Sequence, residues 1–236
     1  MRVAELWRFP VKSLQGEQLG DAAVDSGGLV GDRAYALFDV DAGLGLTARR
    51  MPELLFASAK TIGDGERPAI VLPDGSVVLD DRALSDWLGR RVALRAAADV
   101  DERHYENPLD ADHDADWIVF EGARGPFHDS ARTRVSLVST GTLGAWDRRR
   151  FRSNVLLEGD GEDALVGSRI AIGDVRLDVV KRVGRCVMIT RPQPDGIERD
   201  LDVLKTINRE RDGQLAIGAL VAQPGTMRVG DEVVRT

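Results

Sequence analysis

The chain has 236 residues, 43% of them hydrophobic, which is enough to bury one large core or two smaller ones. It has no apolar run of about eighteen residues, and its first residues, MRVAELWRFP, do not resemble a secretory signal, so we expect a cytoplasmic protein without a membrane span. The formal charge of −7 argues against nonspecific binding to nucleic acid or anionic lipid. A single cysteine excludes an internal disulfide, a four-cysteine zinc site and a cysteine-ligated iron–sulfur cluster within this chain.

The first part of the chain is predicted to form a small β barrel or sandwich. Short β-like segments such as 33–40 (RAYALFDV) and 69–72 (AIVL) are separated by turn sequences such as DAGLG and PDG. One helix is predicted at 81–89, where Asp81 can cap the first turn and the apolar residues fall on one face. The β-like segment 92–97 then closes this unit.

Residues 99–116 (DVDERHYENPLDADHDAD) are acidic and poor in apolar side chains, which predicts a linker or surface loop between a first unit, 1–98, and a second unit, 117–236. The second unit is also rich in β-like segments, which are 117–120, 135–139, 154–159, 169–180, 186–190, 215–223 and 225–233. Its clearest helix is predicted at 201–211, where apolar residues recur at helical spacing. The sequence therefore predicts a mainly β protein with a few helices, in the α+β class.

Cys186 lies in the sequence VGRCVMIT and follows Arg185 directly, with Arg182 just before in the same segment. A lone free cysteine is most often an inert buried thiol. Neighbouring positive charge, however, favours the thiolate, which is the form that attacks an electrophile or binds a soft metal. A hydrolase built on Cys186 and His128 is an alternative that no spacing rule supports, so we rank it below metal binding.

Several predicted turns combine cations with hydroxyl groups. Lys12 and Ser13 are adjacent in FPVKSLQG, a pair that suits a phosphate, although Lys and Ser in turns are usually only solvated. Arg33 in GLVGDR, and Thr47 with Arg49 in TARR, can each donate to an anionic oxygen or take part in an ordinary turn and salt bridge.

Two further motifs follow in the second unit. Ser139 and Thr140 in VSTGT are predicted at the end of a strand and the start of a short helix through Trp146. Phosphates bind at such helix starts, but a plain Ser/Thr N-cap, which needs no ligand, is also common. Arg152 and Asn154 alternate in RRRFRSN, which predicts that they share one face of a strand. A buried Arg152 would require an anionic partner.

The order of these motifs resembles the MOSC proteins, the family named after the molybdenum-cofactor sulfurase C-terminal domain. PVKS, GLVGDR, TARR, VST, RFRSN, GRC and GTMRVGDEV follow one another across residues 10–233. Each motif is weak alone, but the whole set in this order is specific. The first half resembles the MOSC N-terminal β-barrel domain and the second half the MOSC domain proper, and the family includes the amidoxime-reducing components.

The resemblance implies that Cys186 coordinates molybdenum held by the dithiolene of a pterin. The other motif residues would bind the pterin and its phosphate; they are Lys12, Ser13, Arg33, Thr47, Arg49, Ser139, Thr140, Arg152, Asn154 and Arg185. Asp129, beside His128, is a candidate catalytic proton donor or orienting group, although a surface carboxylate is the ordinary interpretation. We expect no iron–sulfur cluster in this chain and no pyridoxal phosphate, so electrons would come from a separate protein.

Three functions follow from these patterns. The first is a molybdenum-dependent oxidoreductase that reduces N-hydroxylated or other oxygen-bearing small molecules by two-electron oxygen-atom transfer. The second is a carrier that passes the cofactor, or a persulfide on Cys186, to other enzymes without turnover. The third is a metal-free β-rich binding domain. The segment 191–207 lies where the family has a less uniform substrate-side loop, so the sequence does not identify the substrate.

Overall fold

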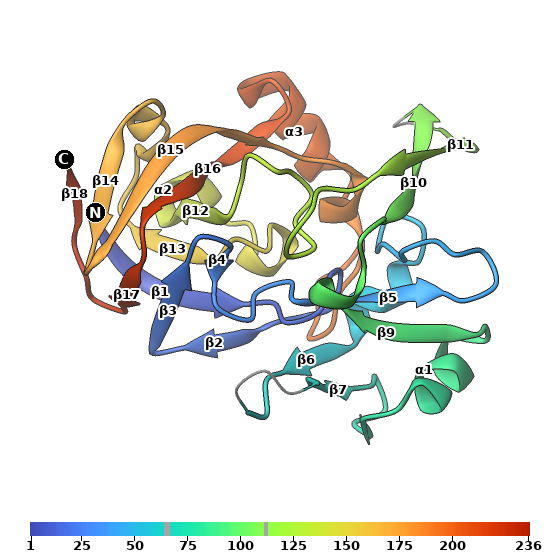
Figure 1. Cartoon of the computed structure of the whole chain (residues 1–236). Helices are drawn as coiled ribbons and strands as arrows, with labels where there is room; N and C mark the ends of the chain where they lie inside the picture. Colours follow the sequence, from blue (N-terminus) through green and yellow to red (C-terminus); the bar gives the residue numbers. More distant parts are fainter. Residues whose placement is uncertain (64–66, 111–112) are drawn as a thin grey trace.

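A computed structural model describes residues 1–63, 67–110 and 113–236 of the chain. Strands dominate this part of the molecule, and the helices are few and short (Figure 1). The mainly β, α+β fold class predicted from the sequence is therefore confirmed. None of the helices in the described ranges has the length and apolar content needed to cross a membrane.

The largest sheet has eight strands and is strongly curved (Figure 1). Its spatial order is β18 (Val233–Arg235), β14 (Arg169–Ile172), β15 (Val175–Gly184), β16 (Gln214–Gln223), β12 (Val135–Ser139), β13 (Val155–Glu158), β1 (Arg2–Arg8) and β2 (Glu17–Leu19). Only β12 and β13 are parallel neighbours. Because β1 pairs with both β13 and β2, the beginning of the chain lies in the same sheet as its C-terminal half.

A second sheet completes the first core. It contains β17 (Gly225–Arg228), β3 (Asp21–Asp25) and β4 (Gly28–Leu29). In β3 the aspartates are exposed while Ala22 and Val24 are buried, which is the alternation of a half-buried strand. Residues of both sheets form one apolar cluster, which includes Val3, Leu6, Val24, Leu137, Val155, Ile170, Leu177, Ile217 and Met227.

The next part of the chain surrounds a second core. Its elements are β5 (Tyr35–Asp39), β6 (Ser58–Lys60), β7 (Ala69–Val71), β8 (Val77–Val78), α1 (Asp81–Leu88) and β9 (Val92–Ala96). Their buried apolar residues include Leu37, Ile70, Leu84 and Leu94. The predicted helix cap is wrong by one residue, because Asp80 accepts from the Ala83 amide at 2.9 Å, whereas Asp81 accepts from the Leu94 amide of β9.

The hairpin β10 (His104–Asp110) and β11 (His113–Glu121) corrects the prediction of a linker or loop at 99–116, of which residues 111–112 lie outside the described part. One buried aromatic residue anchors it, since Tyr105 is 4% exposed and packs against Phe38 and Phe120. Cross-strand hydrogen bonds and this small aromatic cluster stabilise the hairpin, although the acidic composition of the segment predicted a loop. The domain boundaries at 98 and 117 stay a prediction.

The elements predicted at 140–146 and 186–190 differ from those observed. The helix expected through Trp146 is α2 (Thr140–Leu143), because Gly144 ends it with a positive φ of 55°. The segment 186–190 is not a strand: Cys186 precedes the 3-10 helix η5 (Val187–Thr190), whose turn is closed by the Ile189 amide donating to the Cys186 carbonyl at 3.2 Å. This short helix packs on α3 (Asp202–Arg211), which the sequence predicted correctly.

Candidate functional site

Arg152 joins three of the sequence motifs. It is 6% exposed, its Nη1 donates to the Leu14 carbonyl, and its own carbonyl accepts from Arg33 Nη2 at 2.9 Å. Both guanidinium groups lie over the ring of Phe9, at 4.4 Å for Arg152 and 4.8 Å for Arg33 from the ring centroid. These contacts bring the PVKS, GDR and RFRSN motifs together, and the stacking on an aromatic ring helps to hold two like charges close to each other.

Lys12 and Asp129 form an ion pair next to these arginines. Lys12 is 8% exposed, and its Nζ contacts Asp129 and donates to the Phe127 carbonyl at 3.2 Å. The Asp129 side chain is 89% exposed. The charge of Lys12, with smaller contributions from Arg33 and Arg49, holds the pKa of Asp129 well below its usual range. Asp129 is therefore a carboxylate at neutral pH, which favours an orienting role over the proton-donor role.

Arg185 links the cysteine segment to the same group. Its Nε donates to the Leu215 carbonyl at 2.8 Å and its Nη1 to the Phe151 carbonyl at 2.9 Å. Burial lowers the pKa of Arg185 to about 10, an effect that the thiol of Cys186 opposes. Cys186 itself is half-buried and in no disulfide. The half-buried thiol thus follows a half-buried, still positively charged arginine.

The charges of this region form a cation cluster, which we define as Lys12, Arg33, Arg49, Arg152 and Arg185. These five cations interact electrostatically with two carboxylates, Asp32 and Asp129, so the seven groups together have a formal charge of +3. Burial and the charge of Arg33 lower the pKa of Arg152 to about 9. In a chain of net charge −7, such a local excess of positive charge favours an anionic ligand.

The backbone of the cluster motifs is strained. Ser13, Arg33 and Arg152 have φ values of 70°, 50° and 52°, and they make up three of the six non-glycine residues with positive φ in the described chain. Such conformations are unfavourable for residues with a Cβ and gather at binding sites. The Ser13 hydroxyl accepts from the Ala48 amide at 3.0 Å, which stabilises its turn.

The structure does not bring Ser139 and Thr140 to the cation cluster. The Ser139 hydroxyl donates to Glu162 at 2.5 Å and accepts from the Thr142 amide at 3.1 Å, so it caps α2. The Thr140 hydroxyl donates to the Gly159 carbonyl at 3.1 Å. Both hydroxyls have structural partners, and their predicted role in cofactor binding stays a prediction.

Asn154 is also held by structural contacts. It is 1% exposed; its Oδ1 accepts from the backbone and hydroxyl of Ser136, and its Nδ2 donates to the Trp7 carbonyl at 3.2 Å. The predicted strand face shared with Arg152 is wrong, because the positive φ of Arg152 turns the chain before β13 begins at Val155. Asn154 instead joins β1, β12 and β13.

His128 offers no support for a cysteine hydrolase. Its Nε2 lies 3.1 Å from the Gly27 carbonyl, and burial lowers its pKa to about 4, with a further lowering by Arg33. No hydrogen bond joins His128 to Cys186 in the described part of the chain. The ring is therefore neutral near pH 7 and is used in the contact with Gly27.

The sequence patterns did not identify two buried charged residues that contact the cation cluster or the cysteine segment, Asp32 and Arg150. Asp32 is 1% exposed, accepts from the Phe9 amide at 2.8 Å and pairs with Arg33. Its position inside the GDR motif, next to Arg33, could have identified Asp32 as a candidate. Arg150 is 8% exposed, but nothing in the run DRRRFR distinguishes it from its neighbours.

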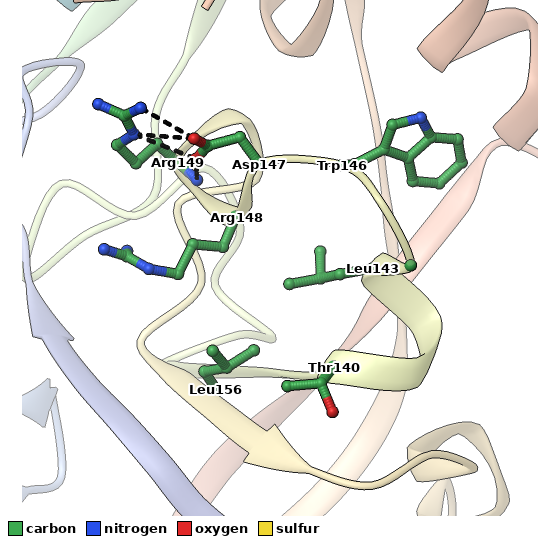
Figure 2. Close-up of a pocket in the computed structure, with 8 residues that line it drawn as sticks. Thr140, Leu143, Trp146, Asp147, Arg148, Arg149 and Leu156 are labelled. Atoms are coloured by element: carbon green, nitrogen blue, oxygen red, sulfur yellow. Dashed lines mark hydrogen bonds and ion pairs between the residues drawn. The ribbon is translucent and has the colours of Figure 1, made fainter. Parts of the chain in front are cut away.

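A separate hollow of about 340 Å³ lies beside α2. Figure 2 shows Leu143 and Leu156 at its centre, the Trp146 ring at one side, and Arg149 paired with Asp147 at the other. Its lining includes neither Cys186 nor a member of the cation cluster. We therefore do not assign the functional site to this hollow.

The fold and the site's geometry define a two-part β protein in which a cation cluster lies next to a cysteine. Residues 1–92 match the family described as the MOSC N-terminal beta barrel domain, and residues 125–234 match the MOSC domain. The chain belongs to the MOSC proteins. Both matches confirm the resemblance found in the sequence motifs.

Two solved structures are similar to the chain. The YuaD protein from Bacillus subtilis is 16% identical, with 98% of this chain and 93% of that chain covered and a TM-score of 0.43. YiiM from Geobacillus stearothermophilus is 17% identical, with 50% of this chain and 67% of that chain covered and a TM-score of 0.37. No curated protein matches the chain.

The residues of the site fit a molybdenum cofactor. Two of the predicted site residues have a buried polar atom, Thr47 Oγ1 and Arg185 Nη2, that lacks a hydrogen-bond partner within the described ranges. A bound anion would satisfy them, because unpaired buried polar groups are costly. The thiol of Cys186 is a ligand suited to a soft metal centre, and the cation cluster suits a phosphate.

Proposed function

We propose that the chain binds the molybdenum cofactor, with Cys186 as the metal ligand and the cation cluster holding the anionic part of the pterin. The main support is the convergence of five cations with only two carboxylates in an acidic protein. Membership of the MOSC family, which is named after a molybdenum-cofactor protein, supports the identity of the ligand. The strained turns at Ser13, Arg33 and Arg152 support a binding site at this place.

The proposed activity is the reduction of N-hydroxylated or other oxygen-bearing small molecules by two-electron oxygen-atom transfer, with electrons from a separate protein. When bound, the cofactor supplies the redox chemistry. The chain supplies binding and orientation: Arg33 and Arg152 fix the anion, and Lys12 holds the Asp129 carboxylate at an exposed position beside it. Asp129 can there accept a hydrogen bond from an N–OH group of a substrate.

The first test is the molybdenum and pterin content of protein expressed in a host that synthesises the cofactor. We expect near-stoichiometric molybdenum in the wild type. Arg152→Met should lower the bound cofactor by about tenfold or more, because it removes a charge-assisted contact. Cys186→Ala should alter the ligation or abolish the activity of the bound metal. Wild-type protein with neither metal nor pterin would contradict the proposal.

A second test separates a reductase from a carrier. A reductase keeps its cofactor and oxidises a dithionite-reduced dye when an N-hydroxylated compound is added. A carrier instead releases cofactor or sulfur to an acceptor protein and shows no turnover. Dye oxidation that depends on both the compound and Cys186 supports the proposed activity.

A further inference from the structure

Arg150 is a buried cation outside the cation cluster. Its guanidinium donates to three backbone carbonyls, those of Ile189 at 3.1 Å, Arg191 at 3.4 Å and Glu198 at 2.8 Å. Burying a guanidinium is costly unless its donors are satisfied, so these contacts define where the side chain lies. All three acceptors come from η5 and the loop that follows Cys186.

Arg150 and its neighbour Phe151 are hydrogen-bonded to residues on both sides of Cys186. On the C-terminal side, the Ile189 amide donates to the Cys186 carbonyl at 3.2 Å, and the Ile189 carbonyl accepts from Arg150. On the N-terminal side, Arg185 donates to the carbonyl of Phe151, the residue next to Arg150. Arg185 and Ile189, which lie on either side of Cys186, are thus each hydrogen-bonded to the segment 150–151.

The same segment also reaches the cation cluster. Two residues after Arg150, the Arg152 side chain donates to the Leu14 carbonyl and its backbone accepts from Arg33. Three consecutive residues, 150–152, therefore connect the cysteine segment, the PVKS turn and the GDR turn through their hydrogen bonds.

We propose that Arg150 is a positioning residue that fixes Cys186 relative to the cation cluster. It acts through the backbone of η5, and within the described ranges its hydrogen bonds go to carbonyls and not to the thiol. The identity of the group that Cys186 binds rests on the proposed function, whereas the placement of Cys186 by Arg150 does not.

Arg149 provides a matched control. It lies in the same short 3-10 helix, η3 (Arg148–Arg150), and contacts the same loop through Asp195 at 3.0 Å and the Pro194 carbonyl at 3.3 Å. The Asp195 side chain is 82% exposed, so this pair is screened by solvent and contributes little. Replacing Arg149 thus removes an arginine and two contacts to the loop, at Pro194 and Asp195, without releasing the three carbonyls that Arg150 binds.

The experiment is alkylation of cofactor-free protein by iodoacetamide, in which the single cysteine gives the whole signal. A half-buried thiol reacts faster when its segment opens locally. Arg150→Met should raise the rate constant by about tenfold or more, and Arg149→Met should change it by less than about twofold. Arg150→Lys should react at an intermediate rate, because a lysine keeps the charge but not the planar fork.

Hydrogen exchange followed by mass spectrometry supplies the second readout. In Arg150→Met, residues 186–200 should exchange faster while strands β12 to β16 exchange as in the wild type. Equally faster hydrogen exchange along the whole chain of Arg150→Met would mean general destabilisation and would overturn the proposal. An alkylation rate of Arg150→Met equal to that of the wild type would also overturn it. If Arg150→Met does not fold, Arg150→Lys must still react faster than Arg149→Lys. Absence of molybdenum would overturn the proposed function but leave these results unchanged.

Discussion

His128 illustrates how a single residue is set by its surroundings. It is 8% exposed, and its Nε2 faces the Gly27 carbonyl next to Gly28. Gly28 has a φ of 115°, and a Cβ there would lie 2.4 Å from the Arg134 carbonyl, so the turn that holds the histidine requires glycine. Burial in this turn lowers the pKa of His128 to about 4.

This lowered pKa predicts a pH dependence of stability. The pKa of His128 is about 4 in the folded chain and about 6.5 in an unfolded one, so the unfolded state binds more protons between these values. The stabilisation is complete above about pH 6.5 and is lost as the pH falls toward about 4. Between pH 7 and pH 4, the free energy of unfolding measured in urea should fall by about 2–3 kcal/mol more for the wild type than for His128→Gln. Parallel curves for the two proteins would contradict this.

At the scale of one element, α2 depends on its cap. The helix has four residues, Thr140–Leu143, too few to be stable alone. Ser139 caps it and also donates to Glu162, a carboxylate that is 0% exposed, and Thr142 donates to the same oxygen at 2.9 Å. The cap and the buried carboxylate therefore stabilise each other.

Ser139→Ala tests this structural role against the predicted cofactor role. Loss of the cap and of one partner of Glu162 should lower the free energy of unfolding of cofactor-free protein by about 2 kcal/mol. Chemical denaturation measures this, with the exposed Ser26→Ala as control. A loss of bound molybdenum without a loss of stability would instead place Ser139 in the cofactor site.

At the scale of the whole molecule, the two ends of the chain complete one structure. The Val233 amide donates to the Met1 carbonyl at 3.0 Å, and both termini lie at the same edge in Figure 1. Strand β3 pairs with β17, and Leu6 and Val24 belong to the same core as Leu177. The second unit thus takes part of its core from the first residues of the chain.

This arrangement predicts that a fragment of residues 117–236 does not fold alone. The fragment lacks β1 to β4, and their removal exposes the core that they cover. A heteronuclear NMR spectrum of the fragment should show the narrow dispersion of an unfolded chain, and adding a peptide of residues 1–30 should restore dispersion. A well-dispersed spectrum of the fragment alone would contradict the prediction.

The sequence predicted the features that depend on neighbouring residues. Alternating apolar residues predicted β5, β12 and β16, and helical spacing predicted α1 and α3. The order of short motifs predicted the MOSC family and grouped most of the cation cluster, because each motif is local and its position along the chain is visible. It failed at 186–190, where an apolar run suits a strand as well as the 3-10 turn that forms there.

Only the tertiary structure decided which side chains share a site. Lys12 meets the Phe127 carbonyl 115 residues away, Arg33 meets Arg152 at a separation of 119, and Arg152 meets Leu14 at 138. Such long-range contacts also gave Ser139 and Asn154 structural partners and buried Arg150. The sequence by itself determined the family, many of the strands and the candidate charges. Charge density, burial and pKa depend on distances between remote residues, which only the folded chain specifies.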